Sequence, residues 1–212
     1  MKRYLWLEWL TLFAGMPVVI LCVHQRFLMV ALLWGGALFA YGTLKRNADF
    51  SHRSEWNMAG LRAGLRPVLL RFVVLAALLA LFTTVTEPDR LFALPRRSLA
   101  LWALIMLLYP ILSVWPQEII FRSFFYHRYA SLFGTHRHYI AASALAFGFA
   151  HIVFANWIVV VFTCIGGAMF AGTYARRRSL ALACLEHALY GCFIFTIGLG
   201  WYFYGAAWHP KV

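Results

Sequence analysis

Charged residues are scarce in this sequence, and acidic residues are the scarcest of them. Only 12% of the 212 residues are charged, and only 7 of these are Asp or Glu, whereas soluble globular chains carry roughly 25% charged residues. The hydrophobic fraction reaches 63%, above the roughly 45 to 50% of soluble chains. The composition therefore excludes an ordinary soluble domain and is typical of an integral membrane protein.

Several enzyme motifs are also missing. The sequence has no HExxH, no GxSxG and no glycine-rich phosphate loop, and so carries no signature of a zinc protease, an α/β-hydrolase or a nucleotide-binding domain. The four cysteines lie singly in or beside apolar runs, without a CxxC pair, and are interpreted as buried free thiols. No cofactor is expected, although two histidines and a carboxylate leave a zinc ion open as an alternative.

Long apolar runs make up most of the chain. Seven of them approach the roughly 20 residues that a membrane-spanning helix needs, at 4–23, 27–44, 67–86, 98–115, 139–155, 157–175 and 180–204. We therefore predict an all-α, polytopic transmembrane helix bundle with about seven spans, forming one domain over residues 1–212. A short motif-bearing helix is expected to begin at Pro116, because proline suits the first helical position.

The basic residues give the chain a formal net charge of +12. Most of them cluster beside apolar runs, at positions 2–3, 45–46, 53–66 and 176–178. Clusters of this kind set membrane orientation and bind anionic lipid headgroups. No continuous basic helix or aromatic RNA-binding signature accompanies them, so nucleic acid is not an expected partner.

The few ionisable side chains inside apolar runs are the candidate functional residues, because a charge at the centre of a span costs roughly 2.5 to 3.5 kcal/mol. Glu118 and Arg122 are four residues apart and share one helix face. They form either a structural ion pair or part of a site. His151 and His187 lie in two other runs. A polar site shared by three helices would remove the cost of three isolated polar groups.

A carboxylate and two imidazoles suit the hydrolysis of an acyl bond. Glu118 can take a proton from water, one imidazole can steer that proton, and the other can stabilise the oxyanion. Arg122 favours the charged form of the buried carboxylate.

This pattern resembles that of the CPBP family of intramembrane proteases, also called Abi or CAAX-protease-like, which includes the type II CAAX prenyl endopeptidases. The segments QEIIFR, FGFAH and SLALACLEHALYG follow the order of the family motifs EExxxR, FxxxH and HxxxN. The resemblance covers residues 116–191, which we take as the catalytic core region. Carried over to this chain, the motif positions are Glu118 and Arg122, then Phe147 and His151, then His187.

Two positions depart from the motifs. Gln117 replaces the first Glu of EExxxR, and Gly191 replaces the Asn of HxxxN. Because glutamine cannot act as a base, the resemblance leaves Glu118, or as an alternative Glu186, to activate water. The missing amide could be supplied by Gln117 or by Asn156.

The sequence therefore predicts an intramembrane endopeptidase, expected in a bacterial inner membrane, that hydrolyses a peptide bond of a membrane-anchored or lipidated substrate. Glu118 would activate water, and His151 and His187 would assist. The alternative is a pseudoprotease that acts as a membrane scaffold or chaperone, if Gln117 and Gly191 disable catalysis. A small proton-coupled transporter is a third class, which paired inverted repeats would favour, and the sequence shows no such repeat.

Overall fold

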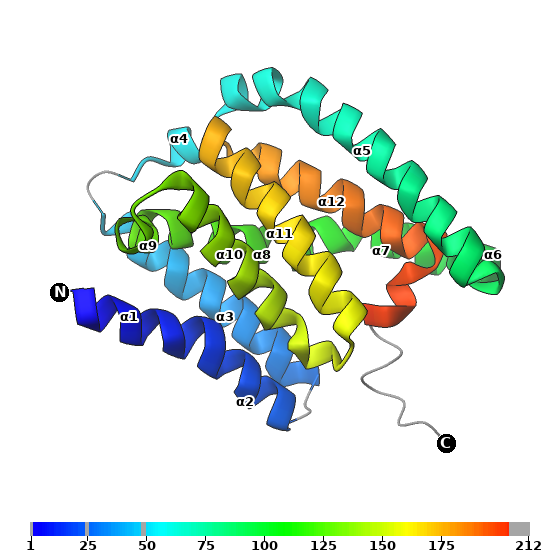
Figure 1. Ribbon diagram of the computed structural model, residues 1–212, viewed down its shortest axis with the longest axis horizontal. Coiled ribbons are helices and arrows are strands. Elements are labelled where there is room, and N and C mark those ends of the chain that lie inside the picture. The colour runs from blue at the N-terminus through cyan, green and yellow to red at the C-terminus, as the bar shows by residue number, and fades with distance from the viewer. Residues whose placement is uncertain (1, 24–25, 48–49, 204–212) are drawn as a thin grey trace.

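The structure is a computed structural model that describes residues 2–23, 26–47 and 50–203, and all regular elements in these ranges are helical (Figure 1). The predicted all-α class is therefore confirmed. Six helical stretches in the described ranges are long and apolar enough to cross a membrane, as a polytopic bundle requires. Residue 204, the predicted end of the last span, lies outside the described residues.

The helical stretches divide into the following elements. The first span comprises α1 (Lys2–Leu10), a π-helical turn (Thr11–Gly15) and α2 (Met16–Val23). It is followed by α3 (Arg26–Lys45), α4 (His52–Glu55), α5 (Met58–Thr86), a 3-10 turn (Pro88–Arg90) and α6 (Ala93–Arg97). The next stretch contains α7 (Leu99–Tyr109), a π-helical turn (Pro110–Val114), α8 (Trp115–Glu118), a second π-helical turn (Ile119–Phe124) and α9 (Phe125–Phe133). The chain continues with α10 (His136–Ala150), a 3-10 turn (His151–Phe154), α11 (Trp157–Arg177), α12 (Leu180–Ile197) and a 3-10 turn (Leu199–Phe203).

The difference between about seven predicted spans and six observed ones lies at residues 139–155. Here α10 has 15 residues, which rise about 22 Å at 1.5 Å per residue, short of a hydrocarbon core of about 30 Å. Instead of spanning by itself, α10 packs along α11 as a hairpin. The turn between them includes Ala155 in the left-handed region, with φ of 49°.

Capping side chains determine where five of the helices begin. Each of these N-cap residues accepts a hydrogen bond from a backbone N–H of the first turn, which satisfies a donor that the helix itself cannot pair. The five residues are Asn57, Ser98, Thr135, Asn156 and Ser179.

The predicted short helix at Pro116 is instead part of a continuous helical stretch of 35 residues, Leu99–Phe133, with a π-helical turn on each side of α8. Pro116 has no N–H, so the helical turn before it, which includes Leu112, lacks one backbone donor. The indole of Trp34 on α3 donates to that carbonyl, with 3.1 Å between Nε1 and O. A neighbouring helix thus donates to a carbonyl of the turn that the proline leaves short of a donor, as happens at prolines in membrane helices.

We expect Trp34→Phe to lower the free energy of unfolding by about 1 to 3 kcal/mol, because it keeps an aromatic ring but removes the indole donor to the Leu112 carbonyl. Denaturation of the purified protein in detergent micelles measures this change. Pro116→Ala provides the control, because it returns an N–H to the helix near this carbonyl. We expect Trp34→Phe to cost less stability in the Pro116→Ala background than in the wild type. An equal loss of unfolding free energy in both backgrounds would contradict the account.

The long stretch from α7 to α9 lies in the middle of the bundle. In Figure 1 the first span and α3 run along one side, α5 runs along the opposite side, and α10 to α12 lie between them. The π-helical turn Ile119–Phe124 packs against α3, and α12 packs against α5. The residues after Pro116 are therefore enclosed by helices from both halves of the chain.

Candidate active site

Glu118 and Arg122 form the ion pair that their spacing suggests, and both side chains are 0% exposed. Arg122 Nε donates to Glu118 Oε2 at 3.1 Å. Its Nη1 donates to the hydroxyl of Ser143 on α10 at 2.8 Å, and the guanidinium lies 4.8 Å from the ring centroid of Phe147. Burying two charges costs free energy, and their attraction offsets that cost only when further hydrogen bonds are made. The contacts of Arg122 with Ser143 and Phe147 contribute here.

His187 joins this pair from α12. Its Nδ1 lies 2.9 Å from the second carboxylate oxygen of Glu118, Oε1, so both oxygens of that carboxylate are engaged. The imidazole stacks on Phe170, with centroids 4.7 Å apart and an interplanar angle of 18°. Its Nε2 lies 3.2 Å from the hydroxyl of Tyr109. A hydrogen-bonded series thus runs from Arg122 through Glu118 and His187 to Tyr109.

His151 lies at the end of α10 with its ring held by the backbone. Nδ1 lies 2.7 Å from the carbonyl oxygen of Phe147, and because a carbonyl only accepts, Nδ1 carries the proton. In the neutral ring this leaves a lone pair on Nε2. The Phe147 ring contacts both imidazoles, with centroids 4.6 Å from His151 and 5.5 Å from His187. One aromatic side chain therefore sets the spacing between the two histidines.

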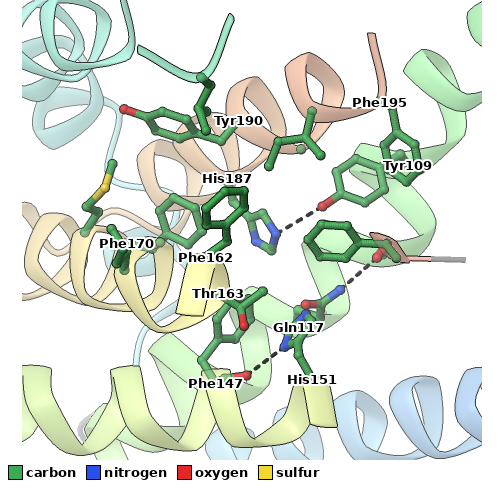
Figure 2. Close-up of a pocket in the computed structure, with 18 of the residues that line it drawn as sticks. Tyr109, Gln117, Phe147, His151, Phe162, Thr163, Phe170, His187, Tyr190 and Phe195 are labelled. Carbon is green, nitrogen blue, oxygen red and sulfur yellow. Dashed lines mark hydrogen bonds between the residues drawn. The ribbon is translucent and has the colours of Figure 1, made fainter. Parts of the chain in front are cut away.

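A cavity of about 510 Å³ opens beside the two histidines (Figure 2). Its walls are mostly apolar side chains of α5, α11 and α12. The polar side chains among its lining residues are Tyr109, Ser113, Gln117, His151, Thr163, His187 and Tyr190. Glu118 and Arg122 are not among the described residues that line it. The ion pair therefore lies behind His187 and has no direct access to the cavity.

A second cavity of about 420 Å³ lies on the other side of Gln117, between the first span, α3 and the π-helical turn after α8. It shares Ser113, Gln117 and His151 with the first cavity. Gln117 Nε2 donates to Ser113 Oγ at 2.7 Å, while its buried Oε1 has no hydrogen-bond partner among the described residues. Gln117 and His151 therefore lie where the two cavities meet, and the amide oxygen of Gln117 can still accept a hydrogen bond.

Two further residues considered from the sequence lie elsewhere. Glu186 is buried and accepts from Arg71 Nε on α5 at 3.0 Å, and Arg71 also donates to Thr173 at 3.0 Å. Asn156 caps α11, where its side-chain oxygen accepts from the N–H of Ile158 at 2.9 Å. Neither residue lines the cavities. Glu186 thus joins α12 to α5, and Asn156 starts a helix.

A protein site for a zinc ion needs three or four ligating side chains close together. Within 2–23, 26–47 and 50–203, no group of three or more His, Cys, Asp or Glu side chains is arranged to hold one. His151 and His187 instead direct Nδ1 to a carbonyl and to a carboxylate.

Sequence reasoning missed Tyr109, which contacts His187 and lines the cavity. It stands inside the fourth apolar run, directly before Pro110 and outside the three motifs. The only sequence signal was a phenolic hydroxyl placed among aliphatic residues, where a buried tyrosine needs a hydrogen-bond partner.

Comparison with protein families gives one finding. Residues 98–193 match the family model described as type II CAAX prenyl endopeptidase Rce1-like. The matched range contains Tyr109, Glu118, Arg122, His151 and His187. Searches of curated proteins and of solved structures gave no match for the chain.

Proposed function

We propose that this chain, whose residues 98–193 belong to the Rce1-like family of type II CAAX prenyl endopeptidases, is an intramembrane endopeptidase that hydrolyses a peptide bond of a lipidated, membrane-anchored substrate. The observation that carries the proposal is the pair of oriented imidazoles, His151 and His187, on one apolar cavity inside a membrane bundle. The compact bundle also fits our proposal of a bacterial inner membrane as its location.

The geometry favours a division of roles that differs from the one predicted from the sequence. Direct activation of water by Glu118 would need the carboxylate to reach the cavity, but the side chain is 0% exposed and is not among the described residues that line either cavity. In our proposal His151 Nε2 is the general base, because its lone pair is free and it lies at the junction of the cavities. Glu118 accepts a hydrogen bond from His187 Nδ1 and so fixes the tautomer and orientation of that ring, as a buried carboxylate does in other catalytic groups.

The reaction proceeds through an ordinary tetrahedral intermediate. The water oxygen attacks the scissile carbonyl carbon while one water proton passes to His151 Nε2, and the carbonyl electrons move onto oxygen. Gln117 Oε1 accepts the other water hydrogen, and groups on the His187 side stabilise the oxyanion. His151 then gives its proton to the leaving nitrogen as the C–N bond breaks.

The two cavities fit a substrate that is apolar on both sides of the scissile bond. The family acts on prenylated substrates in membranes, and burying a hydrocarbon chain contributes about 0.8 kcal/mol per methylene group. We assign the lipid chain to the larger cavity, which lies among α5, α11 and α12. Aliphatic side chains of the peptide would then enter the smaller cavity.

The proposal is tested with purified protein in vesicles that contain phosphatidylglycerol. The probe is a peptide in which an S-farnesyl cysteine is followed by two aliphatic residues and a C-terminal residue, and the control peptide lacks the farnesyl group. We expect cleavage of the farnesylated peptide to be much faster. Equal cleavage of both peptides would contradict the lipid assignment, and binding without cleavage would favour the pseudoprotease.

We expect Glu186→Gln to leave the cleavage rate of the folded protein unchanged. Glu186 pairs with Arg71 away from both cavities, so its charge does not reach the reacting atoms. Rates normalised to the folded fraction measure this, because loss of the contact with α5 can lower stability. A strong loss of cleavage rate at a constant folded fraction would show that Glu186 takes part in the reaction.

A further inference from the structure

Tyr109 fills the space beside Gly191, one of the two positions that depart from the motifs. A Cβ atom added to Gly191 would overlap the ring and the hydroxyl of Tyr109, which are the nearest atoms to it. The ring is held on two sides, edge-on to His187 at 6.2 Å and to Phe195 at 5.4 Å between centroids. Because the phenol is fixed there, position 191 has no room for a side chain while Tyr109 is present.

The Tyr109 hydroxyl therefore stands on the cavity wall where a side chain at position 191 would otherwise reach. It lies 3.2 Å from His187 Nε2, the contact drawn as a dashed line in Figure 2. Two other polar groups of this cavity are already engaged, since His187 Nδ1 faces Glu118 and the Thr163 hydroxyl donates to the carbonyl of Val159 at 2.7 Å. A phenolic O–H can rotate about its C–O bond toward a new acceptor.

We propose that Tyr109 is a further catalytic residue whose O–H donates a hydrogen bond to the oxyanion formed from the scissile carbonyl. This inference rests on the proposed peptidase function. As water adds to the carbonyl carbon and its proton moves to His151 Nε2, the carbonyl oxygen gains negative charge. The Tyr109 hydroxyl hydrogen then turns from His187 Nε2 to that oxygen. No bond to Tyr109 breaks, so the residue is unchanged after the proton on His151 passes to the leaving nitrogen.

Tyr109→Phe tests this role, because it keeps the ring beside Gly191 and removes only the hydroxyl. With the farnesylated peptide in vesicles we expect kcat to fall by about 10² to 10³, the effect of losing one oxyanion donor, with little change in KM. Tyr139→Phe is the matched control, because it removes a buried hydroxyl that has no hydrogen-bond partner among the described residues and does not line either cavity. Its kcat is expected to equal that of the wild type.

A pair of substitutions tests whether Tyr109 occupies the space that a side chain at position 191 would use. Gly191→Asn alone should disturb the site, because the new side chain overlaps Tyr109. With Tyr109→Ala the space is free, and the amide N–H of Gly191→Asn can take over as donor. We expect the double variant to cleave faster than Tyr109→Ala alone. A folded double variant that is no faster would contradict the shared position.

The outcomes separate this inference from the function on which it rests. Cleavage that is lost in His151→Asn but kept in Tyr109→Phe would overturn the role of Tyr109 alone. A folded wild-type protein that cleaves neither peptide would overturn the proposed function, and the role of Tyr109 with it.

Discussion

His151→Asn should lower the cleavage rate by about two to four orders of magnitude, the usual contribution of a general base. The asparagine amide keeps an N–H near the place of Nδ1, where it can still donate to the carbonyl of Phe147. The asparagine side chain has no basic nitrogen in the place of His151 Nε2. The loss should therefore appear in single-turnover rates of the farnesylated peptide while the folded fraction stays close to that of the wild type.

His136→Asn is the matched control for this variant. His136 is exposed at the start of α10, so the same chemical change there should leave the rate unaltered. A His151→Asn protein that cleaves at the wild-type rate would contradict the assignment. The base would then have to be sought in the series from Glu118 to Tyr109.

Glu118→Gln should abolish cleavage and also lower the free energy of unfolding by about 3 to 5 kcal/mol, the cost of leaving a buried charge without its partner. Arg122 is 0% exposed and has its main ionic contact with Glu118. The neutral amide no longer balances the guanidinium, and it no longer fixes the tautomer of His187 as the carboxylate does. Denaturation in detergent micelles measures the first effect, and peptide cleavage measures the second.

A second substitution separates stability from chemistry. In Glu118→Gln/Arg122→Met the uncompensated charge is gone, and replacing both members of a buried pair is often close to neutral. We expect this double variant to regain much of the lost stability but none of the lost activity. Recovery of cleavage together with stability would show that the ion pair is purely structural.

Much of the fold was accessible from the sequence because lipid imposes a simple requirement. A chain that crosses a bilayer must satisfy its backbone hydrogen bonds within helices of about 20 apolar residues. The apolar run at 139–155 met the composition rule but not the length rule, because Thr135 starts α10 and the turn through Ala155 ends it. The ends of α10 depend on its capping residues and on its packing against α11. Hydropathy alone shows neither of these.

The structure brings Glu118, Arg122 and His187 together, but the sequence did not indicate the directions of the side chains around them. Gln117 and Glu118 are neighbours, and neighbouring side chains leave a helix about 100° apart. Packing of the helix decides which of them faces a cavity, and in this fold Gln117 does while Glu118 faces His187 and Arg122. The sequence shows the two residue types but cannot show the rotation of the helix that carries them.

Tyr109 lay beyond sequence reasoning for a related reason. Gly191 looked like the loss of a functional side chain, and Tyr109 looked like one more aromatic residue in an apolar run. Their relation exists only in space, where α7 and α12 bring the phenol into the volume beside the glycine. In our proposal, the Tyr109 hydroxyl on α7 takes the part of the side chain that is missing at position 191 of α12.

The most direct test of peptide hydrolysis in the membrane is mass spectrometry of the products that wild type and His151→Asn form from the farnesylated peptide in the same vesicles. Our account predicts two fragments from the wild type, with water added at a single bond, and intact peptide from the variant. Intact peptide with folded wild-type protein, or the same fragments from both proteins, would contradict it.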